Sequence, residues 1–167
     1  MKSGDKTCTP KYIAKDIISW LAPSGICLDP CCGLGAFYEF LPEGRVWCEI
    51  KKNKDFFDYK DPVVWVIGNP PYSIFEEFLE HSFKIAVNVC FLVPTNKVFQ
   101  RQKIMQMINE YGGIKAMRIY GSGTSIGFSF GFSVGAFHFA KGYQGCALIS
   151  LGPLIVNSQS KIVNYKK

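Results

Sequence analysis

One apolar run, residues 63–68, is followed directly by an asparagine and two prolines, and this junction restricts the folds open to the chain. A short apolar segment bounded by turn residues is typical of a buried strand. Pro70 and Pro71 have no N–H to continue a ladder of backbone hydrogen bonds, so the strand must end before them. The strand therefore delivers Asn69 and Tyr72, one on each side of the prolines, to an edge of a sheet.

Segments with helix and strand patterns alternate along the rest of the chain. Helices are expected at residues 9–21, 36–41, 72–83 and 98–111. Strands are expected at residues 25–28, 46–50, 63–67, 87–93, 114–120 and 134–139, with further apolar pieces at 146–151 and 154–156. Thr9 is the expected N-cap of the first helix, and Pro42 with Gly44 should end the second. This alternation predicts an open α/β sheet that binds its ligand at the carboxyl ends of the strands.

The composition is that of a globular protein, with 48% hydrophobic and 19% charged residues. We expect a single domain over residues 1–167, with frayed ends at about 1–8 and 158–167. No apolar run approaches the roughly 20 residues of a membrane span, and residues 1–10 lack the apolar stretch of a secretory signal. These features predict a cytoplasmic protein without a membrane partner. The net charge of +6 is compatible with nucleic acid as a partner.

The seven cysteines do not form the spacing of a disulfide framework. Cys31 and Cys32 are adjacent, and Cys27 and Cys48 lie in strand-like runs. A metal site built on Cys27, Cys31 and Cys32 would lack a second CxxC or a histidine cluster. We therefore expect reduced thiols and no bound metal.

The motif Asn69-Pro70-Pro71-Tyr72 has a specific chemical use. The side-chain oxygen of Asn69 and the carbonyl oxygen of Pro70 can together accept both protons of a planar amino group. Tyr72 can stack on the ring that carries this amine. The motif is therefore suited to methylation of an exocyclic or amide nitrogen.

Upstream of this motif, residues 29–35 read Asp-Pro-Cys-Cys-Gly-Leu-Gly, and Glu49 lies between the two motifs. Together they resemble the class I S-adenosylmethionine-dependent amino-methyltransferases, in the motif order of the DNA adenine-N6 enzymes. The resemblance covers residues 9–142. It implies a Rossmann-like, mostly parallel sheet with helices on both faces and a terminal antiparallel strand, and S-adenosylmethionine as cofactor. It implies that the catalytic residues are Asn69, Pro70, Pro71 and Tyr72.

The resemblance also implies a cofactor site: Thr9, Pro10, Asp29, Pro30, Cys31, Gly33, Gly35, Glu49, Ile50, Asp55, Phe56 and Asn69. Asp29 would face the ammonium group of the cofactor, directly or through water. Glu49 would accept hydrogen bonds from the two ribose hydroxyls. Asp55 and Phe56 would flank the adenine.

A base inside a duplex cannot reach such a pocket, so it must flip out or arrive single-stranded. The residues expected to contact the nucleic acid substrate are Tyr72, Ser73, Lys97, Arg101, Phe128 and Phe130. Tyr72 would stack on one face of the base, and Phe130 or Phe128 would close the other.

The chain departs from the family pattern at two places. The family has a helix and a strand between the positions that match Glu49 and Asp55, and five residues replace them here. This predicts a sheet truncated near strands 2 and 3, and a more open adenine pocket. The chain also stops soon after the last family strand, where a target-recognition domain would follow. Specificity is therefore expected to be low, or to come from a homodimer or another partner.

The leading hypothesis is adenine-N6 methylation of DNA, and DNA is favoured over RNA as the partner. RNA adenine methylation uses the same motif, because the 2′-OH would be read by surface loops. Cytosine-N4 enzymes more often have Ser-Pro-Pro. Glutamine-N5 methyltransferases share Asn-Pro-Pro-Tyr, but their glycine motif and N-terminal helical domain differ from this sequence. A non-catalytic cofactor-binding subunit is a further alternative.

Overall fold

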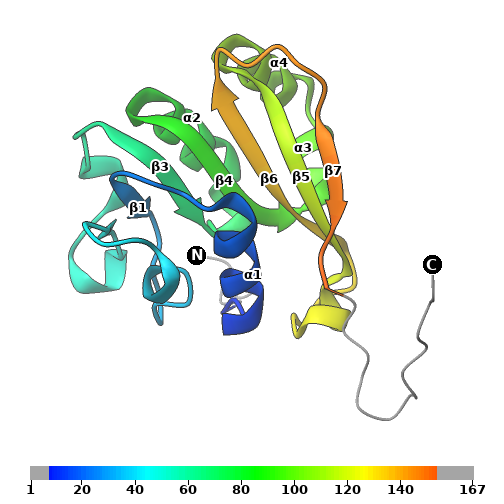
Figure 1. The fold of residues 1–167 in the computed structure, drawn as a ribbon, viewed down its shortest axis with the longest axis horizontal. Helices are drawn as coiled ribbons and strands as arrows, with labels where there is room; N and C mark the ends of the chain where they lie inside the picture. Colours follow the sequence, from blue (N-terminus) through cyan, green and yellow to red (C-terminus); the bar gives the residue numbers. More distant parts are fainter. Residues whose placement is uncertain (1–7, 154–167) are drawn as a thin grey trace.

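Seven strands form one mixed sheet in the computed structural model, which describes residues 8–153 (Figure 1). The strands are β1 (Cys27–Asp29), β2 (Val46–Trp47), β3 (Val63–Gly68), β4 (Ala86–Pro94), β5 (Gly112–Ser122), β6 (Ser133–Lys141) and β7 (Leu148–Leu151). Their order across the sheet is β2-β1-β3-β4-β6-β5-β7. β6 is antiparallel to both of its neighbours, and all other neighbouring pairs are parallel. The carboxyl ends of β2, β1, β3 and β4 therefore meet at one edge.

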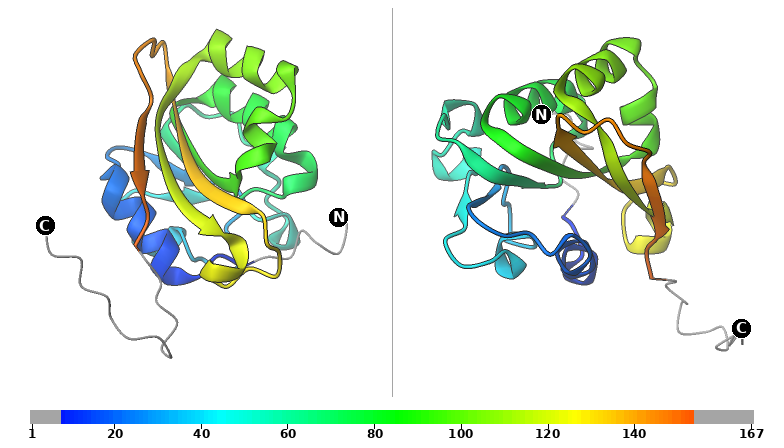
Figure 2. Two further views of the ribbon diagram at one scale, coloured as in Figure 1. Left: turned by 90° about the vertical axis from the view of Figure 1, so that its right-hand side faces the viewer. Right: turned by 45° about the horizontal axis from the view of Figure 1, so that its top comes forward.

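Helices cover both faces of the sheet, as the sequence predicted (Figure 2). The helices are α1 (Lys11–Leu21) on one face, and α2 (Phe75–Ile85), α3 (Thr95–Phe99) and α4 (Gln102–Tyr111) on the other. In this part of the chain, 8–153, no helix combines the length and the apolar character that crossing a bilayer requires.

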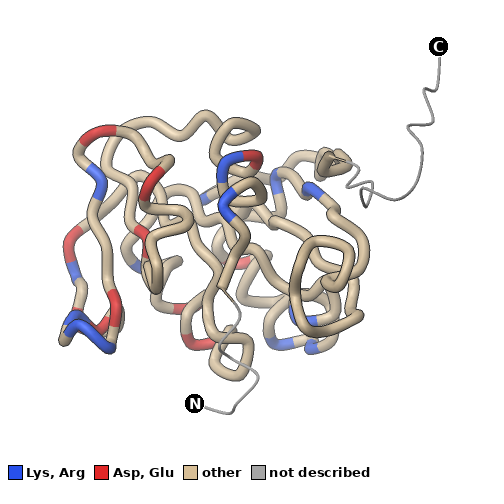
Figure 3. Tube along the Cα trace, turned by 90° about the horizontal axis from the view of Figure 1, so that it is seen from below, with Lys and Arg blue, Asp and Glu red and all other residues tan. Residues whose placement is uncertain are grey.

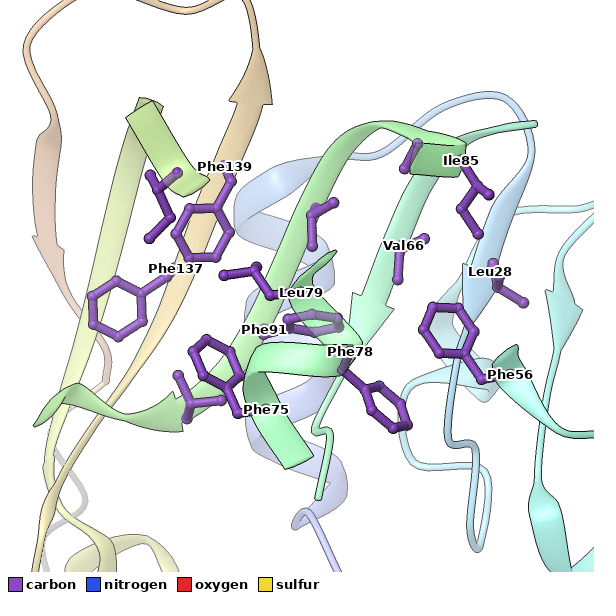
Figure 4. Close-up of a cluster of buried hydrophobic side chains, with 14 of the residues drawn as sticks. Leu28, Phe56, Val66, Phe75, Phe78, Leu79, Ile85, Phe91, Phe137 and Phe139 are labelled. Carbon is purple, nitrogen blue, oxygen red and sulfur yellow. The ribbon is translucent and has the colours of Figure 1, made fainter. Parts of the chain in front are cut away.

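The two faces bury separate apolar clusters because successive residues of a strand point to opposite sides. In β3, Trp65 and Ile67 join the cluster that includes Ile13 and Ile17 of α1. Val66 points the other way, into the cluster with Phe78 and Leu79 of α2 that Figure 4 shows. Burial of each large side chain stabilises the fold by about 1.5–3 kcal/mol. Packing on both faces thereby fixes the position and direction of β3 in the sheet.

The sheet is truncated beside β2, as expected. Between β2 and β3 the chain forms two 3₁₀ turns, η3 (Ile50–Lys52) and η4 (Phe56–Asp58), and β2 is the edge strand. β2 has only two residues, shorter than the expected 46–50, because Glu49 turns away to form an isolated bridge with Lys54.

Two expected helices take a different form. Residues 36–41 form turns and one 3₁₀ turn, η2 (Tyr38–Phe40), because Pro42 and Gly44 leave too little chain for a stable helix. The helix expected at 98–111 is split into α3 and α4, because Arg101 between them is extended, with φ −120° and ψ 126°. Arg101 is the N-cap of α4, and its carbonyl oxygen accepts from the N–H of Ile104.

The two ends of the described chain also differ from expectation. Thr9 does not cap α1: Pro10 is the N-cap, and it makes no side-chain capping hydrogen bond. The apolar piece expected at 146–151 forms β7, which adds a parallel edge strand beside β5; the expected antiparallel strand is confirmed as β6. The apolar piece expected at 154–156 lies outside the described residues.

Candidate active site

The carboxyl edge of the parallel strands brings together residues that are far apart in sequence. Asp29 is the last residue of β1, and Asn69 directly follows β3, which pairs with β1. Glu49 lies two residues after β2, on the other side of β1. Because parallel strands end at the same edge, these three polar residues lie in one row there.

The loop after β1 is joined to Glu49 by hydrogen bonds. The N–H of Gly33 donates to Oε2 of Glu49 at 2.8 Å, and the N–H of Lys51 donates to Oε1 at 3.2 Å. Gly33 and Gly35 have φ values of 52° and 86°, a region that residues with a Cβ rarely adopt. Each carboxylate oxygen can accept more than one hydrogen bond, so Glu49 retains acceptor capacity for a ligand.

Asp29 is buried behind this loop, with 1% of its surface exposed. Burial raises its pKa to about 7; hydrogen bonds from the backbone of Cys31 and Tyr38 oppose the rise, and the charge of Glu49 adds to it. The Cys31 N–H lies 3.3 Å from Oδ1 of Asp29. A buried carboxyl with a pKa near 7 is poised to ionise when a cation binds next to it.

Gly68 is a site residue that the sequence reasoning did not single out. A Cβ at this position would lie 3.0 Å from Cδ of Pro30 and 3.2 Å from Oδ1 of Asp29. Glycine therefore lets the end of β3 pack directly against the loop after β1. The sequence signal for Gly68 was its place as the last residue of an apolar strand, just before Asn-Pro-Pro.

Asn69 is held by two other segments of the site. Its side-chain Nδ2 donates to Oγ1 of Thr9 at 3.0 Å, and its backbone carbonyl oxygen accepts from Sγ of Cys31 at 3.1 Å. Burial, with the nearby charges of Asp29 and Glu49, raises the pKa of Cys31 well above its usual value, so the thiol keeps its proton and can donate. Thr9, Cys31 and Asn69 thus form one connected unit.

The predicted aromatic partners of the substrate lie next to each other. Tyr72 begins the 3₁₀ turn η5 (Tyr72–Ile74), and its ring contacts that of Phe130 edge-on, with 5.7 Å between centroids and an interplanar angle of 85°. Phe130 belongs to the loop between η6 (Gly123–Ile126) and β6. Phe128 is buried with 4% exposure and packs beneath Phe130, so of the two phenylalanines it is Phe130 that reaches Tyr72.

Asp55 and Phe56 directly follow Lys54, whose backbone pairs with that of Glu49 in this row. Asp55 caps η4 by accepting from the N–H of Phe57, and it lines a cavity of about 400 Å³ beside the free edge of β2, together with Trp47 and Tyr59. The ring of Phe56 is buried and stacks on Phe78. The side chain of Asp55 therefore lies at the edge of the sheet, and the ring of Phe56 lies in the core.

The basic residues expected to face substrate lie on or beside α3. Lys97 is on α3, and Arg101 lies between α3 and α4. Arg101 forms an ion pair with Glu76 at 3.1 Å, and Lys103 contacts the same carboxylate. Basic and acidic segments alternate in several places when the molecule is seen from below (Figure 3). Ser73, next to Tyr72, is exposed.

The chemistry of the row fits S-adenosylmethionine. Asp29 can pair with an ammonium group, and Glu49 can accept from a vicinal diol. Apolar side chains stand at the surface next to these carboxylates: Leu34 in the glycine loop is 86% exposed, and Ile50 beside Glu49 is 61% exposed. Pro10 is the N-cap of α1, and Pro30, directly after β1, packs against Gly68.

Comparisons with known proteins found likeness in structure alone: no family model and no curated protein matches the sequence. A provisionally named RNA methyltransferase from Pyrococcus horikoshii aligns with a TM-score of 0.64 and 16% identity over 83% of this chain and 92% of its own. A provisionally named class I S-adenosylmethionine-dependent methyltransferase from Listeria monocytogenes aligns with a TM-score of 0.62 and 15% identity over 90% of this chain and 67% of its own.

A type I restriction-modification methyltransferase subunit from Streptococcus thermophilus aligns with a TM-score of 0.61 and 16% identity, over 84% of this chain. The aligned region spans about half of that subunit, 46% of its length. At such identities the likeness concerns the fold. The chain has the fold of the class I S-adenosylmethionine-dependent methyltransferases.

Proposed function

We propose that the chain is a cytoplasmic enzyme that transfers a methyl group from S-adenosylmethionine to the N6 amine of adenine in DNA. The observation that carries the proposal is the placement of Asn69 and Pro70 at the carboxyl end of β3. β3 pairs with β1, whose last residue is the buried Asp29. An acceptor pair for an amine thus lies next to a site whose carboxylates suit this cofactor.

The protein's own residues have the task of orienting the amine. When bound, the cofactor supplies an already activated methyl group, so no protein nucleophile is needed. Oδ1 of Asn69 and the carbonyl oxygen of Pro70 would accept hydrogen bonds from the two amine protons, which draws the nitrogen lone pair out of the ring and toward the methyl donor. The methylated nitrogen would then release one of these protons to water. Tyr72 would stack on one face of the base, and Phe130, which lies edge-on against Tyr72, would have to turn aside to close the other face. Positioning and fixed dipoles of this kind can lower a barrier by several kcal/mol.

The structural neighbours include proteins named for restriction-modification and for RNA methylation. The likeness to a restriction-modification methyltransferase subunit supports DNA, and the likeness to an RNA methyltransferase keeps RNA as the alternative. The pairing of Arg101 with Glu76 reduces the free positive charge next to the site. Phosphate contacts carry no sequence information, and we propose in addition that intrinsic sequence specificity is low, with recognition supplied by a second copy or another protein.

The test is transfer of tritiated methyl groups from S-adenosylmethionine to duplex DNA, single-stranded DNA, total RNA and a glutamine-containing release factor. Asn69→Ala removes the acceptor, and Asn96→Ala, on an exposed position of α3, is the matched control. The proposal predicts label in DNA as N6-methyladenine, lost in Asn69→Ala and kept in Asn96→Ala. Label in RNA alone, or in protein alone, would show that this polymer, and not DNA, is the substrate. Cofactor binding without label in any polymer would favour a non-catalytic subunit.

A further inference from the structure

The carboxamide of Asn69 has two ends of nearly equal size and opposite chemistry. Oδ1 accepts hydrogen bonds, whereas Nδ2 only donates them. An amine substrate presents donors, so only an orientation that directs Oδ1 toward the amine is productive. With Nδ2 directed toward the amine, two donors would face each other and the contact would be repulsive. The proposed reaction therefore depends on which way this side chain is turned.

Thr9 makes the hydrogen bond that bears on this choice. Its Oγ1 accepts from Nδ2 of Asn69 at 3.0 Å, across sixty positions of sequence. A hydroxyl can also donate, so this bond fixes the position and plane of the carboxamide, and in the structure Oδ1 is the end that points away from Thr9. The Cys31 thiol holds the backbone carbonyl of Asn69 at the same time, at 3.1 Å. Backbone and side chain of the asparagine are thus fixed from two different segments.

Thr9 is itself held in place by the helix that follows it. Pro10, the next residue, is the N-cap of α1, and its carbonyl oxygen accepts from the N–H of Ile13. The hydroxyl of Tyr12 donates to the carbonyl oxygen of Ile126 at 3.1 Å. Further along α1, Asp16 binds Arg118 of β5 through both carboxylate oxygens, at 2.7 and 2.9 Å. The first helix can therefore act as a rigid support for the Thr9 hydroxyl.

We propose that Thr9 is a positioning residue, which acts through Asn69 by anchoring its carboxamide at Nδ2 while Oδ1 is directed toward the substrate amine. This inference rests on the proposed function, because it names a further residue of the same site. It differs from the role in cofactor binding that the family resemblance implies for Thr9.

The test compares Thr9→Val, which keeps the shape but loses the hydroxyl, with Thr9→Ser, which keeps the hydroxyl. Thr95→Val removes a threonine hydroxyl at the start of α3 and is the matched control. Loss of one hydrogen bond corresponds to about a tenfold change in rate. We expect Thr9→Val to lower kcat at saturating cofactor about tenfold, with the Kd for S-adenosylmethionine within about twofold of wild type. Thr9→Ser and Thr95→Val should retain the wild-type kcat.

A second readout does not depend on activity. The side-chain amide signals of Asn69 in a ¹⁵N–¹H spectrum are identified by their loss in Asn69→Ala. They should shift in Thr9→Val and stay in place in Thr9→Ser. Unshifted signals in Thr9→Val, or a weaker Kd with an unchanged kcat at saturation, would overturn the positioning role. If wild type transfers no methyl group, the proposed function fails, and the spectrum still decides whether Thr9 orients Asn69.

Discussion

The backbone N–H of Gly33 donates a 2.8 Å hydrogen bond to Oε2 of Glu49, so the glycine loop after β1 and the acidic residue after β2 form one structural unit. The loop needs positive φ values at Gly33 and Gly35, and the carboxylate of Glu49 holds it in that conformation. A ligand bound to Glu49 would therefore lie beside the glycine loop.

Replacement of Glu49 by glutamine should weaken cofactor binding. The amide retains one acceptor oxygen but loses the charge, and hydrogen bonds to charged groups contribute about 1.5–3 kcal/mol each. We expect the Kd for S-adenosylmethionine, measured by calorimetry, to rise about tenfold or more. Glu43→Gln makes the same change at an exposed position and should leave the Kd unaltered. A Kd for Glu49→Gln equal to that of wild type would remove Glu49 from the site.

Cofactor affinity should depend on pH through Asp29. Burial raises the pKa of Asp29 to about 7, so this carboxyl is largely protonated at pH 6 and ionised at pH 8. A cationic ammonium pairs with the ionised form, so affinity should increase as pH rises through 7, by up to about tenfold per pH unit below the pKa. Calorimetry across this range should show that binding releases a proton. The Asp29→Asn variant should bind more weakly with a flat profile; a flat profile in wild type would contradict the assignment.

Phe130 should affect the substrate and not the cofactor. Its ring lies against Tyr72, and stacking of a base on an aromatic ring contributes about 1–3 kcal/mol. We expect Phe130→Leu to raise the KM for polynucleotide about tenfold, with an unchanged Kd for S-adenosylmethionine. Phe130→Tyr, which retains the ring, should restore the wild-type KM. Equal KM values for all three proteins would show that Phe130 is a structural residue.

Asp16 should stabilise the attachment of α1 to the sheet. Arg118 binds both of its carboxylate oxygens, and the Tyr120 hydroxyl donates to Oδ2 at 2.6 Å. We expect Asp16→Asn to lower the free energy of unfolding by about 1–2 kcal/mol, measured by urea denaturation. Glu80→Gln, which removes the charge of the exposed Glu80–Lys84 pair, should leave stability unchanged.

The Asp16 interaction should also depend on pH in a defined direction. Burial raises the pKa of Asp16, but hydrogen bonds from Arg118 and Tyr120 outweigh this effect and hold it below its ordinary value of 3.8. The contribution to stability is therefore present above pH 3.8 and is lost as pH falls through the lowered pKa. Wild type and Asp16→Asn should converge in stability in acid. A difference in stability that persists unchanged in acid would contradict the lowered pKa.

The row of site residues could be predicted from sequence because strand ends follow from local pattern. Asp29 closes one apolar run and Asn69 follows another, and parallel strands bring such ends to one edge. Contacts that depend on tertiary packing could not be predicted in this way. Thr9 looks like a helix cap beside Pro10, but its hydroxyl accepts from Asn69 instead. Phe56 looks like a ligand contact next to Asp55, but packing against Phe78 buries it.

Single-turnover methyl transfer to an oligodeoxynucleotide with one adenine, followed by nucleoside mass spectrometry, tests the role of Asn69 most directly. Loss of a hydrogen-bond acceptor that acts in the transition state should lower the rate of methyl transfer at least about a hundredfold. We predict N6-methyladenine with wild type, and a rate reduced by that factor in Asn69→Ala at saturating cofactor. Equal rates in the two proteins, or a methyl group at any other atom, would contradict it.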